Sequence, residues 1–182
     1  MTRITATEID GVRVKASKTA SDSRGSFIKV TPDLVFQDRL DSVAVSINPR
    51  AGTIRGLHFQ TKPFAEEKIV TCIQGLLFDV IVDIRPNSKT FGKIASFELS
   101  AENSLQVYLP QGIAHGFQTL QDNTIVHYCL SANYSTNSSF SINPFGELGI
   151  DWPLPNYTVS EKDSNGISFS IAVEKYSNDL EN

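Results

Sequence analysis

Two histidines lie in short segments that could place their imidazoles in one pocket. His58 belongs to the segment Arg-Gly-Leu-His-Phe-Gln at residues 55–60, and His115 follows Pro110 and Gly112 at the end of an apolar run. Proline and glycine at these positions are typical of a tight turn that would direct the imidazole back toward a sheet. Because histidine readily exchanges a proton near neutral pH, the pair indicates a site for proton transfer.

Other side chains in strand-like segments supply the remaining groups that proton transfer requires. Asp79 lies inside an apolar run, where an unpaired carboxylate would be costly, so we expect it to orient His115. A solvated outer face is the alternative for Asp79. Lys68 and Arg55 could bind phosphate or stabilise an oxyanion, and Tyr128 could deliver a proton. If they converge in the fold, these groups can remove and return a proton beside a carbonyl.

The strand-like run at residues 77–85 alternates between two faces. One face carries Phe78, Val80, Val82 and Ile84. We expect this apolar face to meet the core between two sheets, because successive side chains of a strand point to opposite sides. The opposite face would then carry Asp79, Ile81, Asp83 and Arg85.

A metal site is an alternative use of the histidines. The residues with the outline of the two metal-binding segments of cupins are His58, Gln60, Glu67 and His115. Such a site needs a second histidine where Gln60 stands, so the set is poor in ligands and we expect no metal. His127 does not complete the set, because it is next to Tyr128 and neighbouring side chains of a strand point to opposite faces. A structural or exposed position is expected for His127.

Nucleophilic catalysis and phosphate-loop chemistry are both disfavoured. Cys72 and Cys129 lie in strand-like runs with no sign of an activated thiolate, so we expect two buried, reduced thiols. The sequence contains no Gly-x-Ser-x-Gly elbow and no glycine-rich loop that would hold phosphates.

The charge and hydrophobicity of the 182 residues limit the partners. The net charge of -4, without a basic cluster, argues against a nucleic-acid partner held by phosphate contacts. A few local cations could still bind a small anionic substrate. No apolar run approaches the length that spans a membrane, and the first residues do not form a signal peptide. We therefore expect a cytoplasmic protein with no membrane partner.

Short strand-like segments recur along the chain, with turn residues between them. They cover residues 5–15, where a glycine turn interrupts the strand, and residues 43–47, 67–73, 76–84, 93–99, 106–109, 116–120 and 124–130. This pattern, with almost no helix, predicts an all-β sandwich or barrel in a single domain over residues 1–182. Short helices are expected at residues 32–40 and from about residue 160, where Ser160 could cap the first turn. The polar tail after residue 175 is expected to be flexible.

Several of these segments together carry a resemblance to one family. They are residues 22–25, 55–60, 68–75, 78–85, 88–92, 99–103, 110–117, 149–153 and 160–163, in that order along the chain. This series resembles the dTDP-4-dehydrorhamnose 3,5-epimerase family, the sugar-nucleotide epimerases of the cupin superfamily. It covers most of residues 20–165.

The resemblance implies a cupin-type jelly-roll β-sandwich with a few short C-terminal helices, working as a homodimer without metal or organic cofactor. His58 is similar to the family's general base and Asp163 to its paired carboxylate. Tyr128 is similar to the acid on the other side of the sugar, and Lys68 to the lysine beside the 4-keto oxygen. The implied substrate-binding residues are Arg24, Phe27, Arg55, Gln60, Asp79, His115 and Tyr134, with Arg24 reaching in from the partner subunit.

The implied reaction is inversion at C3, C5 or both of an NDP-4-keto-6-deoxyhexose, with dTDP the expected nucleotide. The chain departs from the family pattern at Val43 and Val45, where the family carries Gln and Asn on a strand lining the site, at Ser46, and in the loop 135–144. These departures are expected to change contacts with the ring substituents. A metal-dependent cupin, a sugar-nucleotide ketoisomerase and an inactive sugar-nucleotide-binding cupin are the alternatives.

Overall fold

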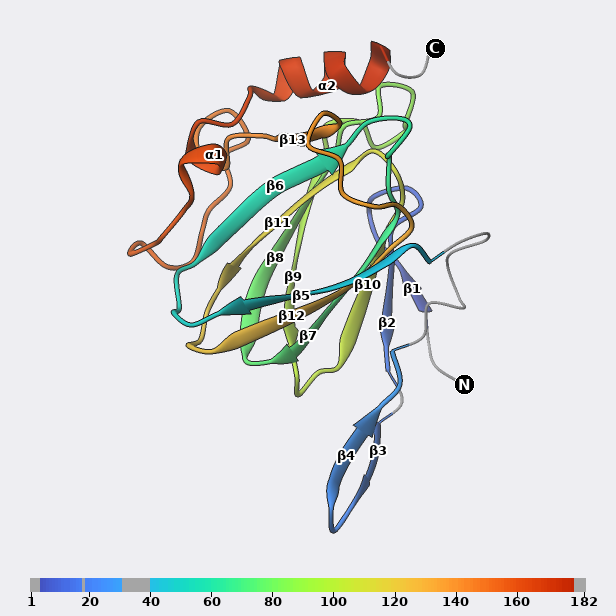
Figure 1. The fold of residues 1–182 in the computed structure, drawn as a ribbon, viewed down its shortest axis with the longest axis vertical. Helices are drawn as coiled ribbons and strands as arrows, with labels where there is room; N and C mark the ends of the chain where they lie inside the picture. The colour runs from blue at the N-terminus through green and yellow to red at the C-terminus, as the bar shows by residue number, and fades with distance from the viewer. Residues whose placement is uncertain (1–3, 18, 31–39, 179–182) are drawn as a thin grey trace.

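The computed structural model describes residues 4–17, 19–30 and 40–178, which form two facing antiparallel sheets and a separate hairpin (Figure 1). The first sheet has the strand order β1 (Ile4–Ala6), β2 (Arg13–Ala16), β10 (Leu105–Leu109), β7 (Lys68–Gln74), β12 (Thr124–Leu130) and β5 (Ser42–Asn48). The second has the order β13 (Ser139–Ser141), β6 (Ile54–Gln60), β11 (Ile113–Thr119), β8 (Leu76–Asp83) and β9 (Ile94–Ser100). The hairpin consists of β3 (Thr19–Asp22) and β4 (Gly25–Ile28). The predicted all-β sandwich is confirmed.

The main core fills the space between the two sheets. The first sheet contributes Val70, Cys72, Val107 and Val126, and the second contributes Leu77, Ile81, Leu99 and Phe117. These residues follow the two-residue alternation of each strand, which places every second side chain inside. The same inner faces also carry the polar groups of the pocket described below, so the core and the pocket share one interior.

A second apolar layer covers the outer face of the second sheet. Phe78, Val80, Val82 and Ile84 of β8 and the following turn pack there against Leu57, Phe59, Ile142, Ala172 and Tyr176. Ala172 and Tyr176 belong to helix α2 (Phe169–Asn178), which lies over this side of the molecule (Figure 1). The prediction that these four side chains meet the core between the sheets is therefore wrong. Asp79 and Ile81 face that interior instead, and β8 is apolar on both faces because both are covered.

The predicted strands are confirmed, and several elements had not been predicted. The unpredicted ones are β6, β13 and the β3–β4 hairpin, whereas α2 is one of the expected short C-terminal helices. The predicted helix start is confirmed by α1 (Glu161–Ser164), in which Ser160 accepts a hydrogen bond from the Asp163 backbone N–H. Residues 176–178, which were expected to belong to a flexible tail, are part of α2 instead, and Tyr176 is buried. The rest of that tail lies outside the described residues.

The helix expected at residues 32–40 falls, except for its last residue, outside the described ranges. Among the residues that the structure describes, no helix has the length and apolar character needed to span a bilayer.

Candidate active site

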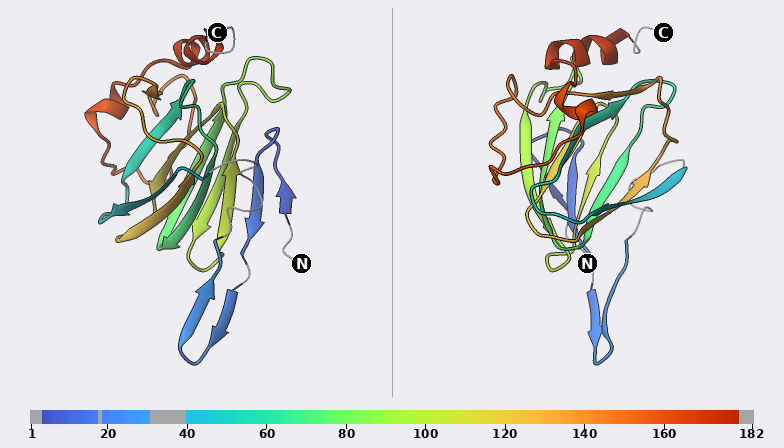
Figure 2. Two further views of the ribbon diagram at one scale, coloured as in Figure 1. Left: turned by 45° about the vertical axis from the view of Figure 1, so that its right-hand side comes forward. Right: turned by 60° about the vertical axis from the view of Figure 1, so that its left-hand side comes forward.

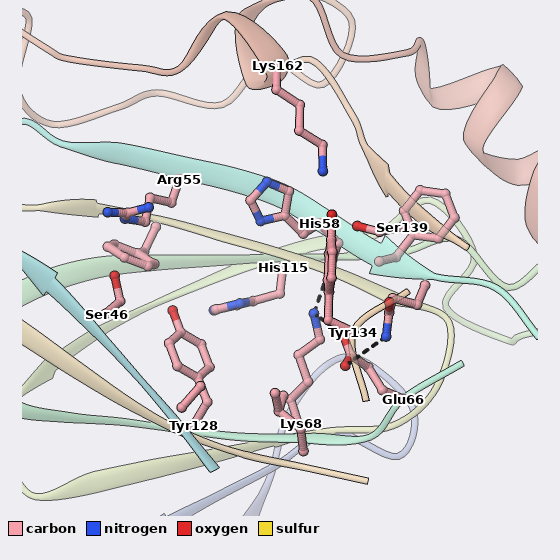
Figure 3. A pocket seen from close by; sticks show the side chains of 15 residues that line it. Ser46, Arg55, His58, Glu66, Lys68, His115, Tyr128, Tyr134, Ser139 and Lys162 are labelled. Carbon is pink, nitrogen blue, oxygen red and sulfur yellow. Dashed lines mark hydrogen bonds and ion pairs between the residues drawn. The ribbon is translucent and has the colours of Figure 1, made fainter. Parts of the chain in front are cut away.

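A pocket of about 280 Å³ opens between the two sheets (Figure 3). The first sheet lines it with Ala44, Ser46, Lys68, Tyr128 and Leu130. The second sheet lines it with Arg55, His58, Phe59, Gln60, His115, Phe117 and Ser139. Glu66, Tyr134 and Lys162 complete the wall from loops and from α1. The site therefore combines side chains from both layers of the sandwich.

Two glycines allow β6 and β11 to approach each other at this pocket. Gly56 has φ of +110°, and a Cβ added to it would lie 2.6 Å from both Gly116 Cα and the His115 carbonyl oxygen. A side chain at Gly56 would force the strands apart, in addition to the strain of its backbone conformation. Close to this contact, His58 and His115 are direct partners across the two strands. The glycines thus bring both imidazoles to one wall.

His58 is paired with a carboxylate from a distant part of the chain. Its Nε2 lies 2.7 Å from Oδ1 of Asp163, which also accepts a hydrogen bond from Ser141 Oγ at 2.7 Å. The other oxygen, Oδ2, accepts one from the Gly56 N–H at 3.2 Å. Burial alone would raise the pKa of Asp163, but the hydrogen bonds and the charge of His58 outweigh it and hold this pKa well below its usual range.

This pair can act as a proton acceptor that faces the pocket. The His58 side chain is 38% exposed, whereas that of Asp163 is only 5% exposed. The carboxylate therefore lies behind the ring and stays ionised. It fixes the orientation of the imidazole and leaves the second ring nitrogen to take up a proton.

A second histidine–carboxylate pair lies deeper. His115 Nε2 is 2.7 Å from Oδ1 of Asp79, and Asp79 is fully buried. The prediction that Asp79 orients His115 is confirmed, and the solvated outer face is wrong. Asp79 does not itself line the pocket. Its place is behind His115, so it positions that ring and does not face a ligand.

Tyr128 reaches the pocket from the opposite sheet. Its ring lies edge-on to His115, with centroids 6.2 Å apart. Burial and the charge of Asp79 raise the pKa of the phenol, so Tyr128 carries its proton at neutral pH. Figure 3 shows His58 and Tyr128 on opposite sides of the cavity, approaching it from β6 and β12.

Lys68 and Gln60 belong to a chain of polar contacts that the sequence prediction had not included. Lys68 Nζ lies 2.9 Å from Glu66 Oε1, and both side chains are almost buried. Gln60 Nε2 donates to the other oxygen of Glu66 at 3.2 Å, and Gln60 Oε1 accepts from the Ser135 N–H at 2.8 Å. Gln60 therefore anchors the loop that carries Tyr134. The available sequence signal was the spacing, since residues two apart on an extended chain share a face.

Three side chains stand at the edge of the pocket. Arg55 is exposed, and its Nε donates to Asn48 Oδ1 at 2.8 Å. Tyr134 is 65% exposed, and Lys162 Nζ lies 5.8 Å from the centre of its ring. A hydrogen bond with Ser139 and, more weakly, the charge of Lys162 lower the pKa of Tyr134. Lys162 had not been predicted, although it immediately precedes Asp163.

Two of the predicted site residues lie far from the pocket of their own chain. Arg24 and Phe27 belong to the β3–β4 hairpin, which projects beyond the sandwich (Figure 2). Arg24 pairs with Asp22 at 2.6 Å, and Phe27 is 72% exposed. Neither lines the pocket.

The expectation for β5 is corrected. Val43 and Val45 are 56% and 53% exposed on the outer side of the first sheet, so they do not line the site. Ala44 and Ser46, on the alternate face, line it instead. Tyr128 pairs directly with Ala44 across β12 and β5. The pocket wall beside the phenol is therefore built from two small side chains.

The structure also shows where the third histidine, the two cysteines and the residues of the alternative metal site lie. His127 is half-buried and points away from the pocket, as its alternation with Tyr128 predicts. Cys72 and Cys129 are buried and unpaired. Glu67, part of the metal outline, does not line the pocket. Within residues 4–17, 19–30 and 40–178, no group of three or more His, Cys, Asp or Glu side chains could hold a metal ion.

Comparisons with known proteins agree with this geometry. The sequence profile of dTDP-4-dehydrorhamnose 3,5-epimerase matches residues 6–170. The enzyme of that name from Sinorhizobium fredii is 42% identical over 151 residues, which cover 79% of this chain and 77% of the relative. The one from Shigella flexneri is 37% identical over 169 residues, which cover 90% and 93%.

A solved structure extends the similarity to the fold. The Legionella pneumophila dTDP-6-deoxy-D-glucose-3,5-epimerase, in complex with dTDP-4-keto-L-rhamnose, superimposes with a TM-score of 0.88 at 34% identity. The match covers 94% of each chain. The predicted cupin-type jelly roll is thus confirmed. The chain belongs to the dTDP-4-dehydrorhamnose 3,5-epimerase family.

Proposed function

We propose that this protein is a cofactor-independent epimerase that inverts C3, C5 or both of an NDP-4-keto-6-deoxyhexose, with dTDP as the nucleotide. The observation that carries the proposal is the opposition of a histidine–aspartate pair and a protonated tyrosine across one pocket. A proton acceptor and a proton donor on two sides of a sugar ring are what inversion at carbon requires. The Legionella relative bound to a dTDP-4-keto sugar supports the same substrate class.

His58 is the proposed base. The C4 ketone acidifies the protons at C3 and C5, and His58 removes one of them while Asp163 stabilises the imidazolium that forms. The electron pair of the broken C–H bond moves into the enolate, whose oxygen carries the new negative charge. Lys68 lies in the pocket wall and stabilises this oxygen.

Tyr128 is the proposed acid. It returns a proton to the same carbon from the opposite face, so the configuration at that carbon is inverted. Its raised pKa keeps it protonated until the enolate forms. His115, held by Asp79, lies beside the phenol and binds the sugar.

Nucleotide binding is proposed to require a second copy of the chain. Arg55 contacts the diphosphate from within the chain, and Tyr134 and Gln60 line the same pocket. Arg24 and Phe27 would come from the partner subunit in a homodimer. The projecting hairpin supports this arrangement, because an isolated two-stranded ribbon with an exposed phenylalanine is marginally stable unless it packs against something. The unpaired cysteines are in keeping with a cytoplasmic location.

The proposal is tested by following hydrogen exchange in deuterated water. With dTDP-4-keto-6-deoxyglucose, the wild-type protein should incorporate deuterium at C3, at C5 or at both, observed by NMR. His58→Ala should abolish exchange, because the base is gone. Tyr128→Phe should impair net inversion more than exchange, since the proton can still be removed but is poorly returned to the other face.

A third histidine provides the control. His127→Gln changes an imidazole on the other side of β12 and should leave exchange unaffected. Wild-type exchange in His58→Ala would refute the base assignment. Binding of the nucleotide sugar without any exchange would identify a binding protein, and activity lost on chelation would identify a metal cupin.

A further inference from the structure

We propose that Glu66 is a positioning residue that holds the ammonium group of Lys68 at the place where the enolate oxygen forms. The inference rests on the proposed function, because it gives Glu66 a part in the same proton transfer. It assigns a role to an acidic residue in the pocket wall that sequence analysis had passed over.

Lys68 carries its charge in a place with little access to water. Its side chain is only 9% exposed where it lines the pocket from β7. Removing an ammonium group from water is unfavourable unless an opposite charge and hydrogen bonds replace the lost hydration. Glu66 Oε1 lies 2.9 Å from Nζ, on a side chain that is equally buried. This carboxylate therefore allows a cation to remain in the pocket wall.

The contacts of the ammonium group also set its direction. Besides Glu66, Nζ has the His58 carbonyl oxygen as a more distant acceptor at 3.5 Å. A lysine ammonium carries three N–H donors at the end of a flexible four-carbon stem. Because two donors are directed at protein oxygens, the third is left for a ligand. Figure 3 shows the stem of Lys68 extending from β7 into the cavity.

Glu66 is itself fixed, and both of its oxygens have a protein partner. Its Oε2 accepts a hydrogen bond from Gln60 Nε2 at 3.2 Å, while Oε1 faces Lys68. Gln60 in turn accepts a hydrogen bond from the Ser135 N–H and donates one to the Asn133 carbonyl oxygen. The carboxylate is thereby tied to the loop that follows β12. Glu66 acts on the reaction through Lys68 and not by contact with the sugar.

The carboxylate has two opposing effects on the enolate. Its negative charge weakens the attraction between Lys68 and the enolate oxygen. Without that charge, however, a nearly buried ammonium group is unfavourable, and the flexible stem would carry it toward solvent. Stabilisation of an oxyanion depends on donors that are fixed beforehand at the correct distance. We therefore expect the loss of position to outweigh the gain in net positive charge.

The kinetics of Glu66→Gln test this role, because the amide keeps the shape of the side chain and removes its charge. With dTDP-4-keto-6-deoxyglucose, kcat for deuterium exchange should fall by about tenfold to a hundredfold, since the enolate loses a positioned cation. KM should stay within about twofold, because Glu66 does not contact the substrate. Glu66→Asp, which keeps the charge on a shorter stem, should retain more of the rate.

A double-mutant cycle with Lys68→Met shows whether Glu66 acts through the lysine. Methionine keeps an unbranched stem and lacks the charge. In that background Glu66→Gln should cause no further fall in kcat, since no ammonium group is left to position. Urea denaturation of each variant separates loss of fold from loss of rate. A second cycle with Glu66→Asp repeats the comparison with the charge kept.

Glu67 provides a matched control. It is the adjacent acidic residue and is also partly buried, but it does not line the pocket. Its carboxylate is hydrogen-bonded to Tyr108 on β10. Glu67→Gln makes the same change of charge and should leave kcat within about twofold.

An unchanged or raised kcat in Glu66→Gln would overturn the proposal. A further loss of the same size in the Lys68→Met background would also overturn it, as would a rise in KM with kcat intact. Absence of exchange in the wild type would remove the proposed epimerisation and the role of Glu66 with it. Additive losses in a wild type that does exchange would remove the role of Glu66 alone.

Discussion

The chemistry of this site depends on what stands behind each reactive side chain. His58 faces the cavity, but Asp163, which accepts hydrogen bonds from Ser141 and Gly56, holds its ring in place. His115 is held in the same way by Asp79. His58 is partly exposed, whereas His115 and both carboxylates are buried, so the orientation of the rings is fixed while His58 remains open to substrate.

Replacing Asp163 by Asn should therefore reduce turnover without removing the base. The neutral amide cannot stabilise the imidazolium, so the rate of deuterium exchange should fall by about two to four orders of magnitude. The comparison with Ser141→Ala provides the control, because that change removes one hydrogen bond to Asp163 and keeps its charge. A rate equal to wild type in Asp163→Asn would contradict the role of the carboxylate.

The stability difference between the wild type and Asp163→Asn should depend on pH. The pKa of Asp163 is lowered in the folded state, so its ionised form contributes stability at pH values above its unfolded pKa near 4. That contribution is lost as the pH falls through the folded pKa. The difference in unfolding free energy between wild type and Asp163→Asn, measured with urea, should thus be constant above about pH 5 and shrink below about pH 4. A difference that does not vary with pH would show that the charge is not stabilised.

The contact partners of single residues were predictable from the sequence where a side chain did not suit its surroundings. A carboxylate inside the apolar β8 indicated a partner for Asp79, and the structure confirms His115. Glu66 gave no such signal, because it lies in a polar segment where acidic residues are usual. Its only sequence signal was its position two residues before Lys68, on the segment that leads into β7.

At the scale of the strands, the contact between β6 and β11 is the feature on which the histidine wall depends. Gly56→Ala should destabilise the protein by about 2 to 4 kcal/mol, because the added Cβ meets the backbone of β11 and φ is unfavourable for alanine. Chemical denaturation measures this difference. Gly146→Ala is the control, since Gly146 also has a positive φ, +97°, but has no atoms within 4 Å of its added Cβ.

The free energy of unfolding of Gly146→Ala should fall by only about 1 kcal/mol, the cost of placing alanine in this backbone conformation. Equal losses in the two variants would mean that the close approach of β6 and β11 does not constrain the fold. A larger loss at Gly56 would assign the excess to this contact.

Strand positions were predicted better than the faces that the strands bury. The alternation of β8 was recognised, but its apolar face was assigned to the wrong layer. The cover over Val80 and Val82 comes from Ile142, Ala172 and Tyr176, which are at least sixty positions later in the chain. Val43 and Val45 were misplaced for a related reason, since a shift of one residue exchanges the two faces of a strand.

At the scale of the whole molecule, the site is proposed to be completed by a second chain. Mixing two inactive proteins tests this arrangement. One carries Arg24→Ala and Phe27→Ala, and the other carries His58→Ala. If the hairpin serves the partner's pocket, each hybrid dimer contains one intact site, and random reassociation should restore about a quarter of wild-type turnover.

Without such sharing, no dimer in the mixture contains an intact site and activity should not return. Analytical ultracentrifugation of both variants controls for loss of association. A monomeric wild type would contradict the proposal directly. The resemblance implied that Arg24 serves the partner subunit, but the hairpin and its exposure were not predictable from the residues themselves.

The proposed acid, Tyr128, comes from one sheet of the sandwich and the proposed base, His58, from the other. Lys68 and Tyr128 belong to the first sheet, whereas His58 and Arg55 belong to the second. A slight displacement of one sheet relative to the other would keep the backbone hydrogen bonds within each sheet and yet separate the proton donor from the proton acceptor. Turnover therefore depends on the alignment of the two sheets. Activity would fall before spectroscopy detects unfolding.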